Sequence, residues 1–151
     1  MTYFSSSPKN KINAKNLLLC CFFILPLISF SQPVIQYWDS AAGIKKSEVT
    51  YLDGMQNGAF KLWYKNGQLD EWGFFRKGEQ DSIWKNYYEN GKLKSMRHYQ
   101  HGKAKGLFTF FYANGDTATL NSFSNDMRDG IWKTWNNNGK ITSITPYQKD
   151  K

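Results

Sequence analysis

Aromatic and aliphatic residues recur along this chain with a period of 24 residues. The clearest markers are four Asn-Gly pairs at that spacing: Asn66-Gly67, Asn90-Gly91, Asn114-Gly115 and Asn138-Gly139. Ungapped alignment on these pairs produces two aromatic columns, which are Phe60, Trp84, Phe108 and Trp132, then Trp63, Tyr87, Phe111 and Trp135. Self-similarity at a fixed period of roughly 20 to 50 residues indicates a repeat architecture.

Each repeat unit predicts two β-strands joined by a turn. Aromatic and β-branched residues favour strands, and Asn-Gly favours a two-residue type I′ hairpin because both central residues need positive φ. The return connections, which contain Lys77-Gly78 and His101-Gly102, are expected to be looser. The chain therefore predicts an all-β fold, an elongated antiparallel meander of stacked β-hairpins that forms a solenoid-like open sheet.

The apolar positions do not alternate strictly along the predicted strands. The two aromatic columns are three residues apart, as are Leu69, Trp72 and Phe75, whereas a strand with one buried face has a period of two. Either a bulge near the middle of each strand restores one face, or both faces carry aromatic side chains.

The repeats also set the predicted domain organisation. A degenerate first unit at 32–57 forms an N-terminal cap, and a polar tail follows at 148–151. Because one hairpin alone is marginally stable, each unit must share its face with its neighbours. The four full units are expected at 58–81, 82–105, 106–129 and 130–147.

Residues 1–31 have the pattern of a secretory signal peptide. Lys9, Lys11 and Lys15 precede an apolar run from Leu17 to Phe30, and small residues stand before the expected cleavage after Ser31. The apolar run is shorter than the roughly 20 residues that a spanning helix needs. The sequence therefore predicts an exported protein, either periplasmic, on the cell surface or extracellular, that meets the membrane only transiently through its leader.

Candidate chemistry is sparse. Cys20 and Cys21 both lie in the leader, and His98 and His101 are the only histidines, so the mature chain offers no thiolate and too few ligands for a zinc site. The acidic residues do not recur as a column, and no serine stands near a histidine in a pattern typical of catalysis. We therefore expect no catalytic residue, metal or cofactor, and a protein that is not an enzyme.

The net charge is +8, and basic residues gather between Lys85 and Lys105 with Tyr87, Tyr88 and Tyr99 among them. Basic and aromatic side chains together are typical of single-stranded nucleic-acid binding. The leader argues against nucleic acid as a partner, because an exported chain rarely meets it. A solubilising face is the simpler interpretation.

With their glycines, aromatic columns and Asn-Gly turns, these units resemble the MORN repeat variant. The resemblance covers residues 38–147, with departures at Ser82 and Asp126 in place of glycine and at Asn136 in place of tyrosine. Bacterial proteins built from this variant are often labelled antitoxin components of the YwqK family. The resemblance implies an elongated, twisted β-sheet that serves as an interaction scaffold or lies close to a membrane.

Two hypotheses of function follow. The first is an exported, non-enzymatic scaffold that binds another protein through one face or edge of its sheet, with an antitoxin role as a special case. The second is binding of a carbohydrate or envelope polymer through an exposed aromatic row. The aromatic columns are expected to form the core, and where they are exposed the candidate binding residues are Trp63, Trp84, Tyr87, Trp132 and Trp135.

Overall fold

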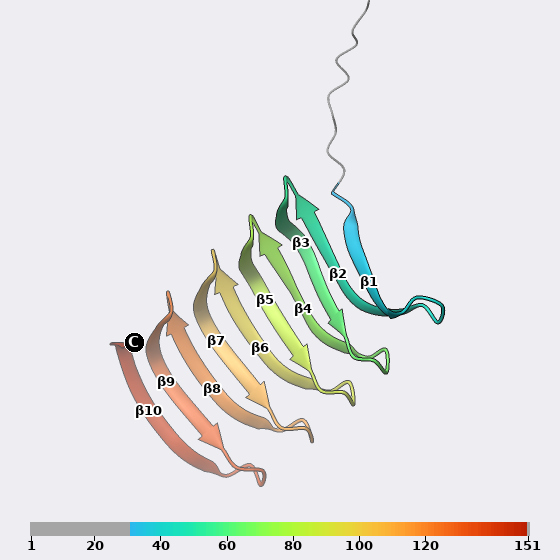
Figure 1. Ribbon diagram of the computed structural model, residues 1–151. Coiled ribbons are helices and arrows are strands. Elements are labelled where there is room, and N and C mark those ends of the chain that lie inside the picture. Colours follow the sequence, from blue (N-terminus) through green and yellow to red (C-terminus); the bar gives the residue numbers. More distant parts are fainter. Residues whose placement is uncertain (1–30, 151) are drawn as a thin grey trace, which may run out of the picture.

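The computed structural model describes residues 31–150, which form ten β-strands in one sheet (Figure 1). The strands follow one another across the sheet in sequence order, and each neighbouring pair is antiparallel. This confirms the predicted all-β open meander. The strands are β1 (Pro33–Asp39), β2 (Ile44–Leu52), β3 (Met55–Trp63), β4 (Leu69–Arg76), β5 (Glu79–Tyr87), β6 (Leu93–Gln100), β7 (Lys103–Phe111), β8 (Thr117–Ser124), β9 (Met127–Trp135) and β10 (Ile141–Asp150).

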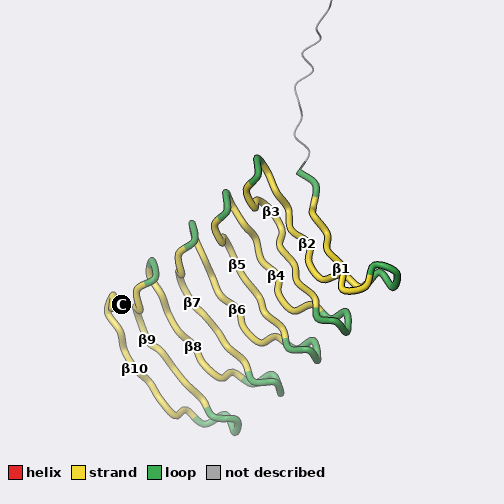
Figure 2. Tube along the Cα trace, in the orientation of Figure 1, coloured by secondary structure: helices red, strands yellow, loops and turns green. Residues whose placement is uncertain are grey.

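The strands bend in the same direction, and the loops that join them form two rows, one at each end of the strands (Figure 2). The predicted signal peptide lies outside the described residues, apart from Ser31. Within residues 31–150, no helix is long and apolar enough to cross a membrane.

The Asn-Gly loops differ from the predicted type I′ turns. In the first of them, the Tyr64 N–H donates to the Gln68 carbonyl (2.9 Å) and the Gly67 N–H donates to the Tyr64 carbonyl (3.0 Å). Gly67 has a positive φ of 82°, but Asn66 does not, so the loop has three residues and ends in a left-handed glycine. The prediction was wrong because Asn66 acts through its side chain, whose Oδ1 accepts from the Gln68 N–H (2.9 Å).

The type I′ turns occur instead at the return connections, which are therefore tight and not loose as expected. Both central residues have positive φ at Asp53-Gly54, Lys77-Gly78, His101-Gly102 and Asn125-Asp126. The strand residues next to these pairs face one another directly, as Arg76 and Glu79 do. Two positive φ values match the twist of the flanking strands, which stabilises a two-residue loop.

A bulge near the middle of every second strand pair explains the imperfect alternation. Register shifts occur between Val49 and Tyr51, and at closely corresponding places in the next three repeats. The bulged segments contain four residues with positive φ, which are Gly58, Ser82, Gly106 and Gly130. The bulges bring aromatic residues of neighbouring strands onto a shared face.

One aromatic residue from each of β3 to β10 joins a continuous row along that face. Neighbouring ring centroids in the row lie between 4.7 and 6.5 Å apart. Trp84 is 1% exposed and Phe108 is 7% exposed, so the row is the hydrophobic core of a single-layer sheet. We call it the aromatic row, and its members are Phe60, Phe75, Trp84, Tyr99, Phe108, Phe123, Trp132 and Tyr147.

The two ends of the sheet are built differently. The degenerate first unit forms the β1–β2 hairpin, and the residues of β1 are exposed throughout. At the other end β10 continues to Asp150, so the predicted tail begins as strand. Pro146 lies within β10, which fits an edge strand because proline donates no ladder hydrogen bond.

Candidate functional site

The pairing register assigns the side chains to two faces. Residues opposite one another on neighbouring strands share a face, and successive residues alternate. Lys61, Trp72, Lys85 and Met96 pair in sequence across four strands, one position away from the aromatic row in β3 and β5. They therefore lie on the other side of the sheet, which we call the outer face.

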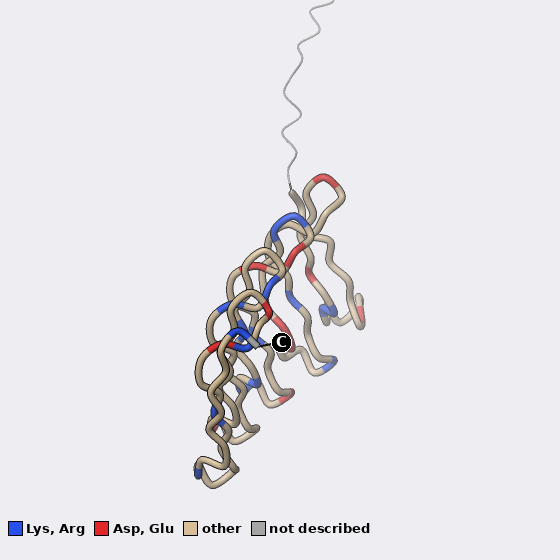
Figure 3. Tube along the Cα trace, turned by 90° about the vertical axis from the view of Figure 1, so that its left-hand side faces the viewer, with Lys and Arg blue, Asp and Glu red and all other residues tan. Residues whose placement is uncertain are grey.

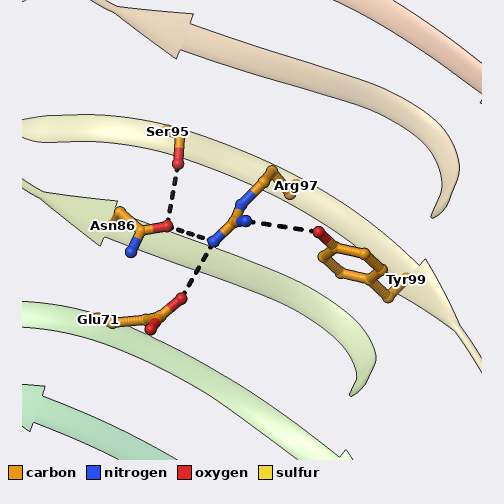
Figure 4. A network of polar contacts seen from close by, with 5 residues as sticks. All are labelled: Glu71, Asn86, Ser95, Arg97 and Tyr99. Carbon is orange, nitrogen blue, oxygen red and sulfur yellow. Dashed lines mark hydrogen bonds and ion pairs between the residues drawn. The ribbon is translucent and has the colours of Figure 1, made fainter. Parts of the chain in front are cut away.

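A polar cluster occupies the aromatic face beside the row (Figure 4). Arg97 Nη2 donates to Glu71 Oε1 at 3.0 Å and also to Asn86 Oδ1. Ser95 Oγ donates to the same Asn86 oxygen at 3.1 Å, and Arg97 Nη1 lies 3.5 Å from Tyr99 Oη. The carboxylate and the guanidinium neutralise one another, so this cluster joins β4, β5 and β6 instead of presenting a free charge to a ligand.

A column of tyrosines, one residue after the second aromatic column, links each unit to the next. The hydroxyls of Tyr64, Tyr88 and Tyr112 each donate to a carbonyl 23 residues further on, at 2.8, 2.7 and 2.6 Å. Burial, with the nearby Asp70 carboxylate, raises the pKa of Tyr64 to about 12. This hydroxyl therefore remains protonated and able to donate at neutral pH, so the column is structural.

The five predicted binding residues fall in two places. Trp84 and Trp132 belong to the aromatic row, whereas Trp63, Tyr87 and Trp135 end their strands beside the Asn-Gly loops. The proposal that Trp84 presents its ring to a partner is corrected, because a side chain that is 1% exposed offers no surface. The other four are partly exposed.

The outer face carries an apolar stripe that the sequence analysis missed. Leu107 and Ile131 are each 53% exposed, Ile83 is 39% exposed and Phe74 is 37% exposed. Register places all four on the outer face. Ile83, Leu107 and Ile131 stand on every second strand, so they recur about 10 Å apart across the sheet. We call these four residues the outer stripe.

Lysines border the outer stripe. Lys85 and Lys133 stand two residues after Ile83 and Ile131, on the same face, and Lys85 Nζ lies 5.8 Å from the Trp72 ring centroid. Over the whole sheet, acidic and basic residues are interspersed along its length (Figure 3). An exposed apolar strip with a charged border is typical of an interaction surface.

The basic stretch noted in the sequence does not form one patch. Arg97 is paired with Glu71 on the aromatic face, whereas Lys85 and Lys94 lie over the rings of Trp72 and Tyr88. The outer stripe could have been found from the repeat alone. Its aliphatic members directly follow the first position of each unit, as in the segments Ser82-Ile83 and Gly106-Leu107.

A family comparison supports the repeat class. The family model described as MORN repeat variant matches residues 56–75, 80–101 and 128–149. No curated protein matches the chain. The intervening unit at 106–129 forms the same pair of strands, β7 and β8, with the same bulge. Three units of this open sheet thus match the MORN repeat variant.

MORN repeats are generally protein-binding or membrane-binding motifs and are not catalytic. Among residues 31–150, no three His, Cys, Asp or Glu side chains are grouped to hold a metal ion.

Proposed function

We propose that this chain is an exported, non-enzymatic β-repeat scaffold that binds another protein through its outer face. The observation that carries the proposal is the outer stripe, in which Leu107 and Ile131 keep more than half of their surface exposed. Large apolar side chains that recur at the repeat period and remain exposed to solvent are typical of a surface that binds a partner.

The aromatic face is less suited to this role. Its rings pack against one another, and the polar side chains beside them are mutually paired. A partner that binds this face would therefore have to displace side chains that already pack or pair with one another. The outer face requires no such rearrangement, since its apolar side chains already point to solvent.

The outer face also indicates the chemistry of its partner. The stripe is apolar, and Lys85 and Lys133 border it. A complementary surface has an apolar ridge with carboxylates along its edge, because opposite charges at the rim favour encounter and orientation. An antitoxin role is the special case in which that partner is a toxic protein produced together with this chain.

Export is part of the proposal and is supported by the leader sequence. A basic start, a short apolar run and small residues before Ser31 fit a signal peptide. Fractionation of the native cells, followed by sequencing of the mature N-terminus, tests this part separately from binding.

The binding test compares two variants as bait on the native cell envelope. Leu107→Ser/Ile131→Ser removes the most exposed members of the stripe, and Tyr51→Ser/Met55→Ser is a matched control that removes exposed side chains from the first hairpins. Both are checked for folding by circular dichroism. We expect one protein, identified by mass spectrometry and then confirmed with purified components, to be bound by the wild type and the control and lost with the stripe variant.

Equal binding by both variants would refute the role of the outer stripe. A glycan partner is the alternative, and it is tested by tryptophan fluorescence against a panel of envelope polysaccharides. A saturable change there, with no protein captured, would replace the proposal of a protein partner.

A further inference from the structure

A cavity of about 470 Å³ lies among β4, β5, β6 and β7, near their type I′ turns. It is lined by both histidines of the chain, together with Arg76, Asp81, Ser82 and Lys105. The bulge between β6 and β7 lies beside it, where pairing skips from Met96 to Tyr99. Its volume lies in the range of small-molecule sites.

The carboxylate of Asp81, which lines this cavity, is already engaged by the chain. Asp81 is 8% exposed, and its Oδ1 accepts from Ser82 Oγ at 2.9 Å and lies 3.6 Å from Arg76 Nη2. Although burial alone would raise it, the pKa of Asp81 is lowered by these groups and by a backbone hydrogen bond from His101. Asp81 therefore stays ionised and forms an ion pair with Arg76, another lining residue of the cavity.

The remaining charge around the cavity is positive. Arg76 from β4 and Lys105 from β7 stand against the single charge of Asp81 from β5. His98 from β6 and His101 from the following turn add ring nitrogens that can donate hydrogen bonds. On the adjoining turns, Lys77 and Lys103 outnumber Glu79.

This set of residues interrupts the repeat. The residues 24 positions before and after His98 are Phe74 and Ser122. In the next unit, glutamine at position 100 takes the place of Arg76. Ser82 adopts a φ of 62°, where the other units have glycine. A non-glycine residue in this region is strained, and its hydroxyl supplies the hydrogen bond to Asp81 that glycine would lack.

We propose that this cavity binds a small oxyanion, a phosphate or carboxylate group, with Arg76 and Lys105 as the cations and His98 and His101 as further hydrogen-bond donors. The anion is either a free small molecule or a group carried by a larger partner. This proposal does not rest on the outer stripe, and its failure would leave the proposed scaffold function unaffected.

Inorganic sulfate is the probe, because it is a tetrahedral dianion that resembles phosphate. We expect one saturable site by calorimetry at low ionic strength. Arg76→Gln should raise the Kd by about 10-fold or more, because it removes a charge-assisted hydrogen-bond donor. His98→Gln/His101→Gln should raise the Kd less, because it leaves both cations in place.

Lys133→Gln is the matched control, because it removes one positive charge from the outer face on β9, away from the cavity. It should leave the Kd for sulfate unchanged. A short polyglutamate peptide forms a second arm: tighter binding than sulfate assigns the anion to a partner's carboxylates, and weaker binding assigns it to a free oxyanion. The proposal is overturned when sulfate does not saturate, or when Lys133→Gln weakens binding as much as Arg76→Gln.

Discussion

Gly73→Ala places one methyl group directly beneath the ring of Trp84. A Cβ at position 73 would lie 2.3, 2.5 and 2.6 Å from three atoms of that ring, where ordinary contact is 3.4–4 Å. Gly73 is not among the glycines with positive φ, so the substitution strains no backbone angle. Its effect therefore comes from packing alone.

The ring has little freedom to move away. Trp84 is 1% exposed, and its ring centroid lies 5.3 Å from that of Phe60 and 4.9 Å from that of Phe75. Overpacking of this kind costs about 1–3 kcal/mol, while alanine returns about 0.4–1 kcal/mol by restricting the unfolded chain. We expect the free energy of unfolding to fall by about 2 kcal/mol, which for a sheet of this size lowers Tm by about 8 °C.

Urea unfolding followed by circular dichroism measures this loss in two backgrounds. Trp84→Phe makes room for the methyl group and removes no hydrogen bond, because the Trp84 Nε1 has no partner among the described residues. Gly73→Ala should therefore be less destabilising in the Trp84→Phe background, with a coupling energy of about 1 kcal/mol or more.

Gly67→Ala is the control for this cycle. Position 67 has a φ of 82° and no atom within 4 Å of an added Cβ, so it adds backbone strain that is independent of residue 84. Its effect should be additive with Trp84→Phe. A Gly73→Ala protein as stable as the wild type, or equally destabilised in both backgrounds, would refute the packing explanation.

Three further predictions concern other contacts. Burial would raise the pKa of Asp81, but the Ser82 hydroxyl and other partners lower it below its usual value. The ionised carboxylate therefore stabilises the fold above the pKa that it has in the unfolded chain, and this stability is lost as the pH falls through the folded pKa. The loss of stability below about pH 4 should accordingly be smaller for Asp81→Asn than for the wild type. Tyr88→Phe removes the 2.7 Å hydrogen bond to the Phe111 carbonyl and should cost about 1 kcal/mol in urea unfolding. Among the four Asn-Gly asparagines at the 24-residue spacing, which all lie within the described residues, only Asn138 donates no side-chain hydrogen bond, so peptide mapping after incubation should find it deamidated before the other three.

Much of the fold was predictable because the same strand and turn signals recur in each repeat. Asn-Gly pairs at a spacing of 24 residues and aromatic columns in register indicate an antiparallel meander, and the strands β3 to β10 follow it. Turn types were not predictable from the same signal. Asn66 stabilises its loop through a side-chain hydrogen bond and does not adopt a positive φ. Lys77 adopts a positive φ although lysine is not among the residues that favour it.

The candidate site was harder to predict, because faces depend on register. The bulge at Ser82 decides that Trp84 and Phe75 share a face while Ile83 points to the other side. The sequence alone does not show whether the side chains of a strand alternate strictly between the two faces or are shifted by a bulge, because this depends on how the strands pair. Trp84 and Trp132, two of the predicted binding residues, therefore belong to the core row, whereas their exposed aliphatic neighbours Ile83 and Ile131 form part of the proposed partner surface.

Two adjacent residues of β7 separate the two faces most directly. Leu107 is 53% exposed on the outer face, and Phe108 is 7% exposed in the aromatic row. Urea unfolding of Leu107→Ser and Phe108→Ser should give a change within about 0.5 kcal/mol for the first and a loss of about 3–5 kcal/mol for the second. Comparable losses in the two variants would contradict the assignment of the aromatic face as core and the outer face as free surface.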